Sequence, residues 1–206
     1  EAAQLASRSV KALPDAEKQA LLKTLAASLE ANADHIIREN KKDLDQMPDA
    51  DPKKDRLLLN PARIQGLADS LRDIAALPDP ANQVISEKKL ENGLLVRKQT
   101  VPLGVVGVIY ESRPNVTVDV AALCIRSGNA CVLRGGTDAF YTNTCLVALI
   151  KTALQNAGVS PEAVQLLPTD RRHVGELLTA VKYIDILIPR GSQQLIDYVR
   201  AEARVP

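Results

Sequence analysis

Two side chains that could take part in chemistry, Arg113 and Asn115, lie in one loop. This loop, Glu111-Ser112-Arg113-Pro114-Asn115, follows the apolar run at residues 107–110. The Asn115 amide is a neutral donor, and such donors stabilise negative charge on a carbonyl oxygen in an oxyanion hole. The Arg113 guanidinium can bind a carboxylate or phosphate through two hydrogen bonds. Spacing alone favours a structural interpretation, with Pro114 in a first helical turn, Asn115 as a cap and Arg113 in solvent.

Two further loops are suited to binding an anion, Arg134-Gly135-Gly136-Thr137 and Pro189-Arg190-Gly191-Ser192. Each places small residues and an arginine between a predicted strand and a predicted helix, where free backbone N–H groups attract anions. The structural alternative is that the glycines only allow tight turns and that Ser192 only caps a helix. Two such loops on one sheet favour a phosphate-bearing ligand, although neither G-x-G-x-x-G nor the P-loop motif occurs.

The three cysteines are not expected to be catalytic. Cys124 and Cys131 lie in apolar segments and are predicted to be small core residues. Cys145 lies early in a predicted helix, where the helix dipole can lower its pKa, but no histidine is close in sequence. The odd number and the absence of C-x-x-C exclude a disulfide framework and a zinc site, and His35 and His173 stand apart, so we expect no metal site and a reducing compartment.

The elements that must position these loops alternate between strand and helix from residue 101 onward. Strands are predicted at 105–110, 130–133, 164–167 and 184–188, and helices at 116–126, 143–156, 173–180 and 193–203. Four strand–helix pairs in succession imply an α/β fold with a parallel, doubly wound sheet. Ligands bind such sheets beyond the carboxyl ends of the strands, where all three loops would lie.

The first part of the chain has a different character. The apolar spacing predicts helices through residues 1–77, including a continuous helix over 57–77 with Pro61 in its first turn. Residues 84–100 carry β-forming residues on both sides of Asn92-Gly93, which predicts a hairpin with a two-residue turn and positive φ at both positions. Because a two-stranded ribbon is marginally stable alone, it must pack on another part of the chain or another subunit.

Composition limits the function classes. With 46% hydrophobic and 25% charged residues, the 206-residue chain can bury a core. The 26 basic and 25 acidic residues give a net charge of +1, which argues against a nucleic-acid or anionic-membrane surface. No apolar run reaches the roughly 18 residues of a membrane span. We expect a cytoplasmic protein, and an incomplete chain, since it lacks an initial Met and stops where another strand would follow.

From Val101 through Arg113-Pro114-Asn115 to Thr117, the sequence closely resembles the γ-glutamyl phosphate reductase (glutamate-5-semialdehyde dehydrogenase) family of the aldehyde dehydrogenase superfamily. The other matching stretches are Asp55-Arg56-Leu57, Ser127-Gly128-Asn129-Ala130, Leu133-Arg134-Gly135-Gly136 and residues 183–192. The resemblance covers the whole chain. It implies an aldehyde dehydrogenase-like cofactor domain made of an N-terminal helical part (1–83) and a dinucleotide-binding α/β part (101–206), with a hairpin oligomerisation arm (84–100) between them.

The resemblance also implies an activity, the NADPH-dependent reduction of γ-glutamyl phosphate to glutamate 5-semialdehyde and phosphate in proline biosynthesis. In this superfamily a cysteine thiolate attacks the acyl carbon while an asparagine holds the oxyanion. Asn115 matches that asparagine, and Arg113 is the expected substrate-binding residue. The residues that match NADP(H) contacts are Ile109, Glu111, Arg134, Gly135, Gly136, Thr137, Gly191 and Ser192. A homo-oligomer and an association with glutamate 5-kinase are further implications.

Two departures from the family pattern keep alternatives open. The family's nucleophile lies in a Ser-Thr-Cys-Asn motif of a catalytic domain that this sequence does not reach, so we expect the 206 residues alone to be inactive. Thr137-Asp138 replaces the Lys-Glu of most relatives, which leaves NADP and NAD both open. A non-catalytic cofactor-binding or assembly module, or another acyl-phosphate or aldehyde oxidoreductase, are the alternative functions. Arg113 argues against a plain aldehyde enzyme, because an apolar substrate would leave its guanidinium unpartnered.

Overall fold

Helices form most of the first 76 residues of the computed structural model. The structure describes residues 1–111 and 113–206, so Ser112 of the predicted Arg113 loop lies outside the described residues. They are α1 (Ala2–Lys11), α2 (Asp15–Ala31), α3 (Ala33–Leu44), α4 (Lys53–Leu57) and α5 (Pro61–Ala76). The prediction of one continuous helix over 57–77 is wrong, because α4 ends at Leu57. Asn60 caps the next helix by accepting the Arg63 N–H at 2.8 Å, and Pro61 begins that helix.

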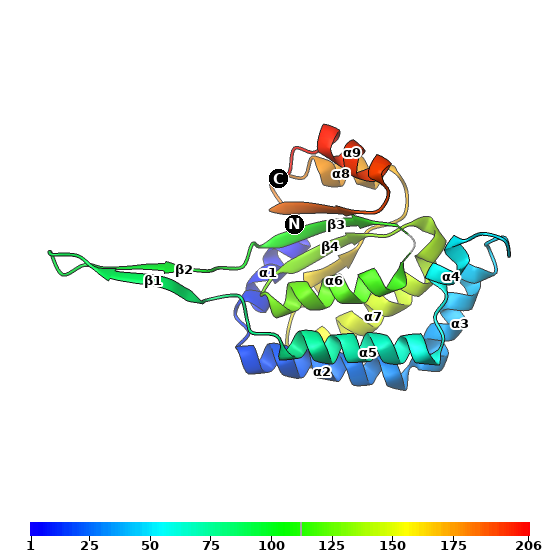
Figure 1. The fold of residues 1–206 in the computed structure, drawn as a ribbon, viewed down its shortest axis with the longest axis horizontal. Coiled ribbons are helices and arrows are strands. Elements are labelled where there is room, and N and C mark those ends of the chain that lie inside the picture. The colour runs from blue at the N-terminus through cyan, green and yellow to red at the C-terminus, as the bar shows by residue number, and fades with distance from the viewer. Residues whose placement is uncertain (112) are drawn as a thin grey trace.

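The predicted hairpin exists, but its turn differs from the prediction. Strands β1 (Val84–Lys89) and β2 (Leu95–Gln99) pair antiparallel and project away from the rest of the molecule (Figure 1). The Leu90 N–H donates to the Leu94 carbonyl at 2.8 Å, which leaves a three-residue loop in place of a two-residue turn. Within that loop only Gly93 has a positive φ, 87°. A tight turn followed by one left-handed glycine is the usual geometry of three-residue hairpin loops.

The predicted parallel sheet is confirmed. Its strands are β3 (Val105–Tyr110), β4 (Ala130–Arg134), β5 (Val164–Leu166) and β6 (Ile186–Arg190), in the order β5-β4-β3-β6. The helices between and after them are α6 (Pro114–Arg126), α7 (Phe140–Asn156), α8 (Arg172–Leu178) and α9 (Gln193–Glu202), with short 3₁₀ turns η1 (Thr137–Ala139) and η2 (Pro161–Ala163). Strand β6 lies two residues later than predicted and contains Pro189, which an edge strand tolerates.

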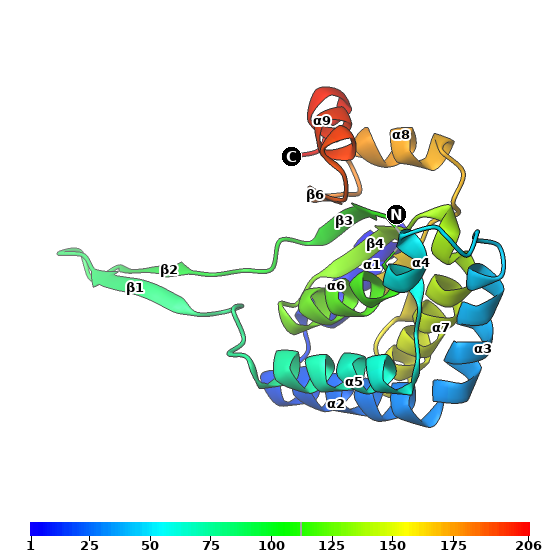
Figure 2. The same ribbon diagram turned by 45° about the vertical axis from the view of Figure 1, so that its right-hand side comes forward.

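Helices cover both faces of this sheet, as a doubly wound fold requires. Helices α6 and α7 lie on one side of it and α8 and α9 on the other, while α2 and α5 form an outer layer against α6 and α7 (Figures 1 and 2). The chain runs from β3 through β4 to β5 and then crosses back to β6 on the far side of β3. The loops after β3 and β6 therefore open at the point where the strand order reverses, the usual position of ligand sites in such sheets.

A buried polar cluster connects the N-terminal helices to the sheet region. The Asn40 amide on α3 donates to the Leu57 carbonyl at 2.9 Å and to Thr142 Oγ1 at 3.1 Å, and its oxygen accepts the Leu59 N–H at 2.8 Å. Asp43, one turn later, accepts the Thr142 N–H at 2.8 Å. Because both α3 side chains are buried and satisfied, they fix the α4–α5 connection against the start of α7.

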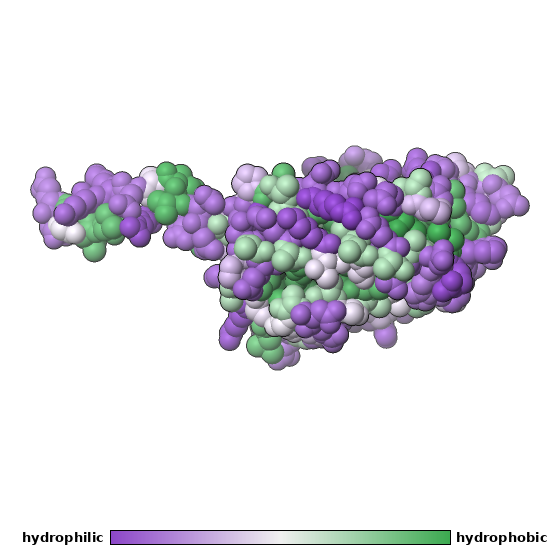
Figure 3. Space-filling view, turned by 90° about the horizontal axis from the view of Figure 1, so that it is seen from below, coloured by the Kyte–Doolittle hydropathy of each residue, from purple (hydrophilic) through white to green (hydrophobic). Residues whose placement is uncertain are grey.

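In Figure 3 the hairpin carries apolar patches, drawn green, among polar side chains drawn purple. The exposed hydrophobic residues of this segment are Val84, Ile85, Leu94, Leu95 and Val96. Isolated exposed hydrophobic residues are common, but several on one ribbon form a surface suited to packing. Among the described residues, no helix is both long enough and apolar enough to cross a membrane.

Candidate functional site

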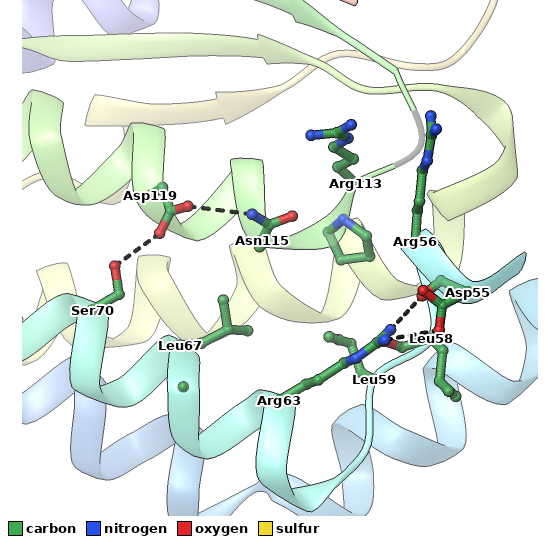
Figure 4. Close-up of a pocket in the computed structure, with 12 residues that line it drawn as sticks. Asp55, Arg56, Leu58, Leu59, Arg63, Leu67, Ser70, Arg113, Asn115 and Asp119 are labelled. Carbon is green, nitrogen blue, oxygen red and sulfur yellow. Dashed lines mark hydrogen bonds and ion pairs between the residues drawn. The ribbon is translucent and has the colours of Figure 1, made fainter. Parts of the chain in front are cut away.

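A cavity of about 580 Å³ lies between α4, α5 and the first turns of α6 (Figure 4). It contains Arg113 and Asn115, the two residues that the sequence predicts for substrate and oxyanion. It also contains Arg56, Arg63 and other side chains from the N-terminal helices, for which the sequence predicts no role. Their only signal is that Asp55-Arg56-Leu57 matches the family pattern. The N-terminal helices thus supply one wall of the candidate site.

Asn115 is half-buried in the first turn of α6, and its environment corrects one interpretation. Pro114 occupies the first turn as predicted, but Asn115 does not cap the helix. Its Nδ2 donates instead to Asp119 Oδ2, one turn further along, over a long 3.5 Å (Figure 4). An amide nitrogen carries two hydrogens, so Asn115 keeps a second N–H for another acceptor.

Asp119 is a carboxylate at the back of the cavity with only neutral hydrogen-bond donors. Ser70 on α5 donates its hydroxyl to Asp119 Oδ1 at 3.2 Å, and Asn115 contacts the other oxygen. Burial raises the pKa of Asp119 above its ordinary value, and the Ser70 hydroxyl and the charge of Arg190 offset part of that effect. Asp119 therefore orients the Asn115 amide at a cost in desolvation.

Three guanidinium groups line the cavity, and they differ in what they bind. Arg63 is engaged, with Nη2 at 2.8 Å from Asp55 Oδ1 and Nη1 at 2.9 Å from the Leu58 carbonyl. Arg56 and Arg113 are exposed, and neither guanidinium group makes a hydrogen bond or ion pair with another residue in the described part of the chain. In Figure 4 both point away from the Asp55–Arg63 pair. The cavity thus presents two cationic groups that are available to an anion.

The loops after β3 and β6 meet at the predicted cofactor edge. Glu111 Oε1 accepts the Ser192 hydroxyl at 2.8 Å, and Oε2 accepts the Ser192 N–H at 3.2 Å. Ser192 also caps α9 by accepting the Leu195 N–H, so the capping interpretation is confirmed. A Cβ on Gly191 would lie 2.7 Å from the Glu111 carboxyl carbon, so the present contact between Glu111 and this turn requires glycine at position 191. The donors at the start of α9 already hold a carboxylate, which is the chemistry a phosphate would need.

The loop after β4 forms the other part of that edge. Arg134 donates through Nη2 to the Thr169 carbonyl at 2.7 Å, while its Nε is buried without a partner. Burial and the charge of Arg171 lower the pKa of the Arg134 guanidinium. A Cβ on Gly135 would lie 2.5 Å from Asn143 Nδ2, so this position also requires glycine.

The remaining predicted cofactor residues occupy different environments at the same edge. Gly136 precedes η1, and the side chain of Thr137 is exposed. Ile109 pairs with Arg134 across β3 and β4, but its side chain is buried in the core. Ile109 can therefore reach a ligand only through its backbone.

The three cysteines are buried and none lines the cavity. The contact with Cys124 and burial raise the pKa of the Cys131 thiol. Burial, together with the nearby charge of Glu39, also raises the pKa of Cys145, so desolvation outweighs the helix-dipole effect considered from the sequence. The predicted core role of Cys124 and Cys131 is confirmed, and Cys145 is buried as well.

Comparisons with known proteins agree with this architecture. The profile of the aldehyde dehydrogenase family matches residues 1–205. The chain is 51% identical over 201 residues to a γ-glutamyl phosphate reductase of Chlorobium phaeobacteroides (strain BS1), covering 98% of this chain and 48% of that protein. The crystal structure of γ-glutamyl phosphate reductase from Thermotoga maritima superimposes with a TM-score of 0.95 at 34% identity, covering all of this chain and 50% of the other.

A more distant structure shares the fold alone. It is glyceraldehyde-3-phosphate dehydrogenase from Methanocaldococcus jannaschii, solved in complex with NADP, with a TM-score of 0.74 and 17% identity over 98% of this chain. The chain spans about half the length of the curated relatives it matches.

Proposed function

The chain belongs to the aldehyde dehydrogenase family, and from this premise we propose that it is the cofactor-binding half of a γ-glutamyl phosphate reductase. The complete protein would reduce γ-glutamyl phosphate to glutamate 5-semialdehyde with NADPH and release phosphate, a step of proline biosynthesis. The observation that carries the proposal is the cavity in which Asn115 lies beside two unpaired guanidinium groups. That combination suits an acyl group that bears negative charge, and the relatives that match the whole chain at about half identity bear this name.

Asn115 is the proposed oxyanion donor. One of its Nδ2 hydrogens is directed to Asp119, which leaves the other for the acyl oxygen of the substrate. A fixed neutral donor stabilises an oxyanion without having to reorganise as the charge develops. Arg113, two residues earlier, is the proposed contact to an anionic group of the substrate.

The described residues fit a dinucleotide phosphate, and we propose NADP(H) as the cofactor. Gly191 and Ser192 would hold the pyrophosphate once Glu111 has turned away from Ser192. Arg134, Gly135, Gly136 and Thr137, with the backbone at Ile109, would hold the adenosine side. The buried, unpartnered Arg134 Nε supports this assignment, because it is a donor without an acceptor. When bound, the nicotinamide would supply the hydride.

The attacking thiolate is proposed to lie outside these 206 residues. Cys124, Cys131 and Cys145 are buried away from the cavity, and none matches the family motif. In the superfamily mechanism such a thiolate attacks the acyl carbon and expels phosphate. The part played by this chain is to bind the cofactor, orient the acyl oxygen and hold the far end of the substrate.

The reverse reaction of the complete protein tests the function. Purified enzyme should form NADPH from NADP⁺ only when glutamate 5-semialdehyde and inorganic phosphate are both present. A protein that binds NADP⁺ but forms no NADPH would be a cofactor-binding or assembly module. Oxidation of simple aldehydes without phosphate would instead identify a different oxidoreductase of the family.

The hairpin at residues 84–100 is proposed to be an oligomerisation arm. Its two strands are exposed along their whole length, and their apolar side chains face solvent (Figure 3). Burying such a ribbon against a second copy would complete its sheet and remove that apolar area from water. We further propose a cytoplasmic homo-oligomer that associates with glutamate 5-kinase, the enzyme whose product would be its substrate.

A further inference from the structure

We propose that Arg56 and Arg113 form a binding site for the α-carboxylate of the substrate, so that the cavity selects acyl phosphates and aldehydes with a second anionic group at their far end. This inference rests on the proposed function and assigns a role to Arg56, whose only sequence signal is its place in the Asp55-Arg56-Leu57 stretch. It is carried by the charge balance around α4, by the way the backbone of Arg56 is held, and by the position of Arg113.

Two charged side chains next to Arg56 in α4 form ion pairs, but Arg56 does not. Lys54 pairs with Asp49 at 2.6 Å, and Asp55 pairs with Arg63 at 2.8 Å. No carboxylate among the described residues lies within ion-pair distance of Arg56. Lys53 and Arg56 are the two α4 charges without an ion pair among the described residues, and of these two only Arg56 lines the cavity.

The backbone on both sides of Arg56 is held unusually well for an exposed residue. Before Arg56 in the chain, the Asp55 carbonyl accepts a hydrogen bond from Arg63. After it, the Leu57 carbonyl accepts from Asn40 at 2.9 Å, and the Leu58 carbonyl accepts from Arg63 at 2.9 Å. Leu57 itself is fully buried and anchors the short helix. The base of the Arg56 side chain is therefore fixed, which lowers the ordering cost of binding a ligand at its tip.

Arg113 stands where a cation is disfavoured unless an anion joins it. It is the residue immediately before α6, at the positive end of the helix dipole, and its side chain caps nothing. With Arg56 on the same side of the cavity, two like charges face a common volume (Figure 4). A carboxylate placed between them would offset the repulsion between the two guanidinium groups and the repulsion of Arg113 by the helix dipole. It could also accept hydrogen bonds from each guanidinium.

The arrangement also matches the order of groups along the proposed substrate. In Figure 4, Arg113 lies between Asn115 and Arg56. A substrate whose acyl oxygen is at Asn115 can extend past Arg113 so that its far end meets Arg56. In γ-glutamyl phosphate that far end carries the α-carboxylate. The phosphoryl group is the other anion of the same molecule, and the experiment below separates the two.

The reverse reaction of the complete enzyme allows this separation, because glutamate 5-semialdehyde and phosphate are then distinct substrates with separate KM values. Arg56→Ala and Arg113→Ala should each raise the KM for the semialdehyde about tenfold to a hundredfold, the range for losing a hydrogen bond to a charged group. The KM for phosphate should change less than twofold. Arg56→Lys should fall between wild type and Arg56→Ala, since it keeps the charge and loses the fork.

The matched control is Arg38→Ala, which removes an exposed arginine of α3 that does not line the cavity, and both KM values should stay at wild-type level. Butanal, which lacks the carboxylate, provides a second readout. The preference of the wild type for the semialdehyde over butanal, as a ratio of kcat/KM, should fall at least tenfold in Arg56→Ala. Because this is a ratio within one variant, it stays informative when a variant folds poorly.

A rise in the KM for phosphate alone would overturn the proposal and assign the two arginines to the phosphoryl group. Unchanged KM values in both variants would remove them from the substrate site. Failure of the proposed function looks different, because the wild type itself would then show no phosphate-dependent oxidation of the semialdehyde.

Discussion

Glu111 and Ser192, residues from loops that follow two neighbouring strands, bind each other through both a hydroxyl and a backbone N–H, at 2.8 and 3.2 Å. The carboxylate thereby occupies the donors at the start of α9 that we assign to the cofactor pyrophosphate. A carboxylate and a phosphate cannot share these donors, and their like charges repel. On the proposed assignment, cofactor binding would require Glu111 to leave Ser192.

Glu111→Gln should tighten cofactor binding. The amide keeps the size of the side chain but removes the charge that competes with the pyrophosphate, so the Kd for NADP⁺ should fall about threefold to tenfold, in line with the worth of one hydrogen bond. Fluorescence titration of the complete enzyme measures this. A weaker Kd would mean that Glu111 is itself a cofactor contact.

Arg134→Ala should weaken binding of NADP(H) by about 1–3 kcal/mol, the contribution of a charge-assisted hydrogen bond. The variant also removes the side chain bonded to the Thr169 carbonyl, so thermal unfolding should be measured alongside. Arg38→Ala again serves as control. An unchanged Kd for both NADP⁺ and NAD⁺ would contradict the assignment of Arg134 to the adenosine side of the cofactor.

Asn115→Ala should lower kcat about a hundredfold to a thousandfold with little change in KM, because the donor acts on charge that develops only in the transition state. Asn115→Asp should be at least as harmful, since a carboxylate would repel the oxyanion. Steady-state kinetics of the reverse reaction measure both variants. A loss confined to KM would instead place Asn115 in ground-state binding.

Asp119→Asn should stabilise the fold at pH 8 more than at pH 4. Burial raises the folded-state pKa of Asp119 above the 3.8 of an ordinary aspartate, so the protein binds that proton more tightly when folded. The associated stability is present at low pH and is lost as the pH rises through the folded pKa. Asparagine does not ionise, so the gain in Tm should grow with pH. Asp73→Asn, at an exposed position of α5, should show no such growth.

Replacing residues 86–98 by a tight loop should shift the oligomer of the complete protein toward monomer in sedimentation velocity. The shortened hairpin would lose exposed apolar residues such as Leu95 and Val96. The sheet and the cavity lie outside this segment, so cofactor binding should persist in the monomer. An unchanged sedimentation coefficient would show that the hairpin is not an assembly contact.

Much of the sheet could be predicted from the sequence, because buried parallel strands are short apolar runs separated by helices. Val105–Tyr110 is buried along its whole length, and its loop was identified from residue types alone. The start of a helix after a strand can also be predicted from residue types, and Ser192 is an example because serine is a common helix cap. The apolar spacing also predicts the helical character of the N-terminal region, although not the break between α4 and α5.

Three features could not be predicted from the sequence, because they depend on contacts that only the folded chain shows. The break between α4 and α5 results from the Asn60 cap, which outweighs an apolar spacing that continues through it. The role of Arg56 depends on Arg63 and Asn40 holding the chain on both sides of it. The two-residue turn predicted from Asn92-Gly93 is wrong because Asn-Gly fits both loop lengths, and the pairing of Leu90 with Leu94 selects the longer one.

Asn40 connects two parts of the candidate site that lie far apart in the sequence. Its amide reaches Leu57, 17 positions along the chain, and Thr142, 102 positions along. The first contact fixes the wall that carries Arg56, and the second fixes the helix that follows the Gly135 turn. One buried amide therefore holds both the wall that carries Arg56 and the helix after the Gly135 turn, so the loss of Asn40 would loosen the proposed substrate and cofactor sides together.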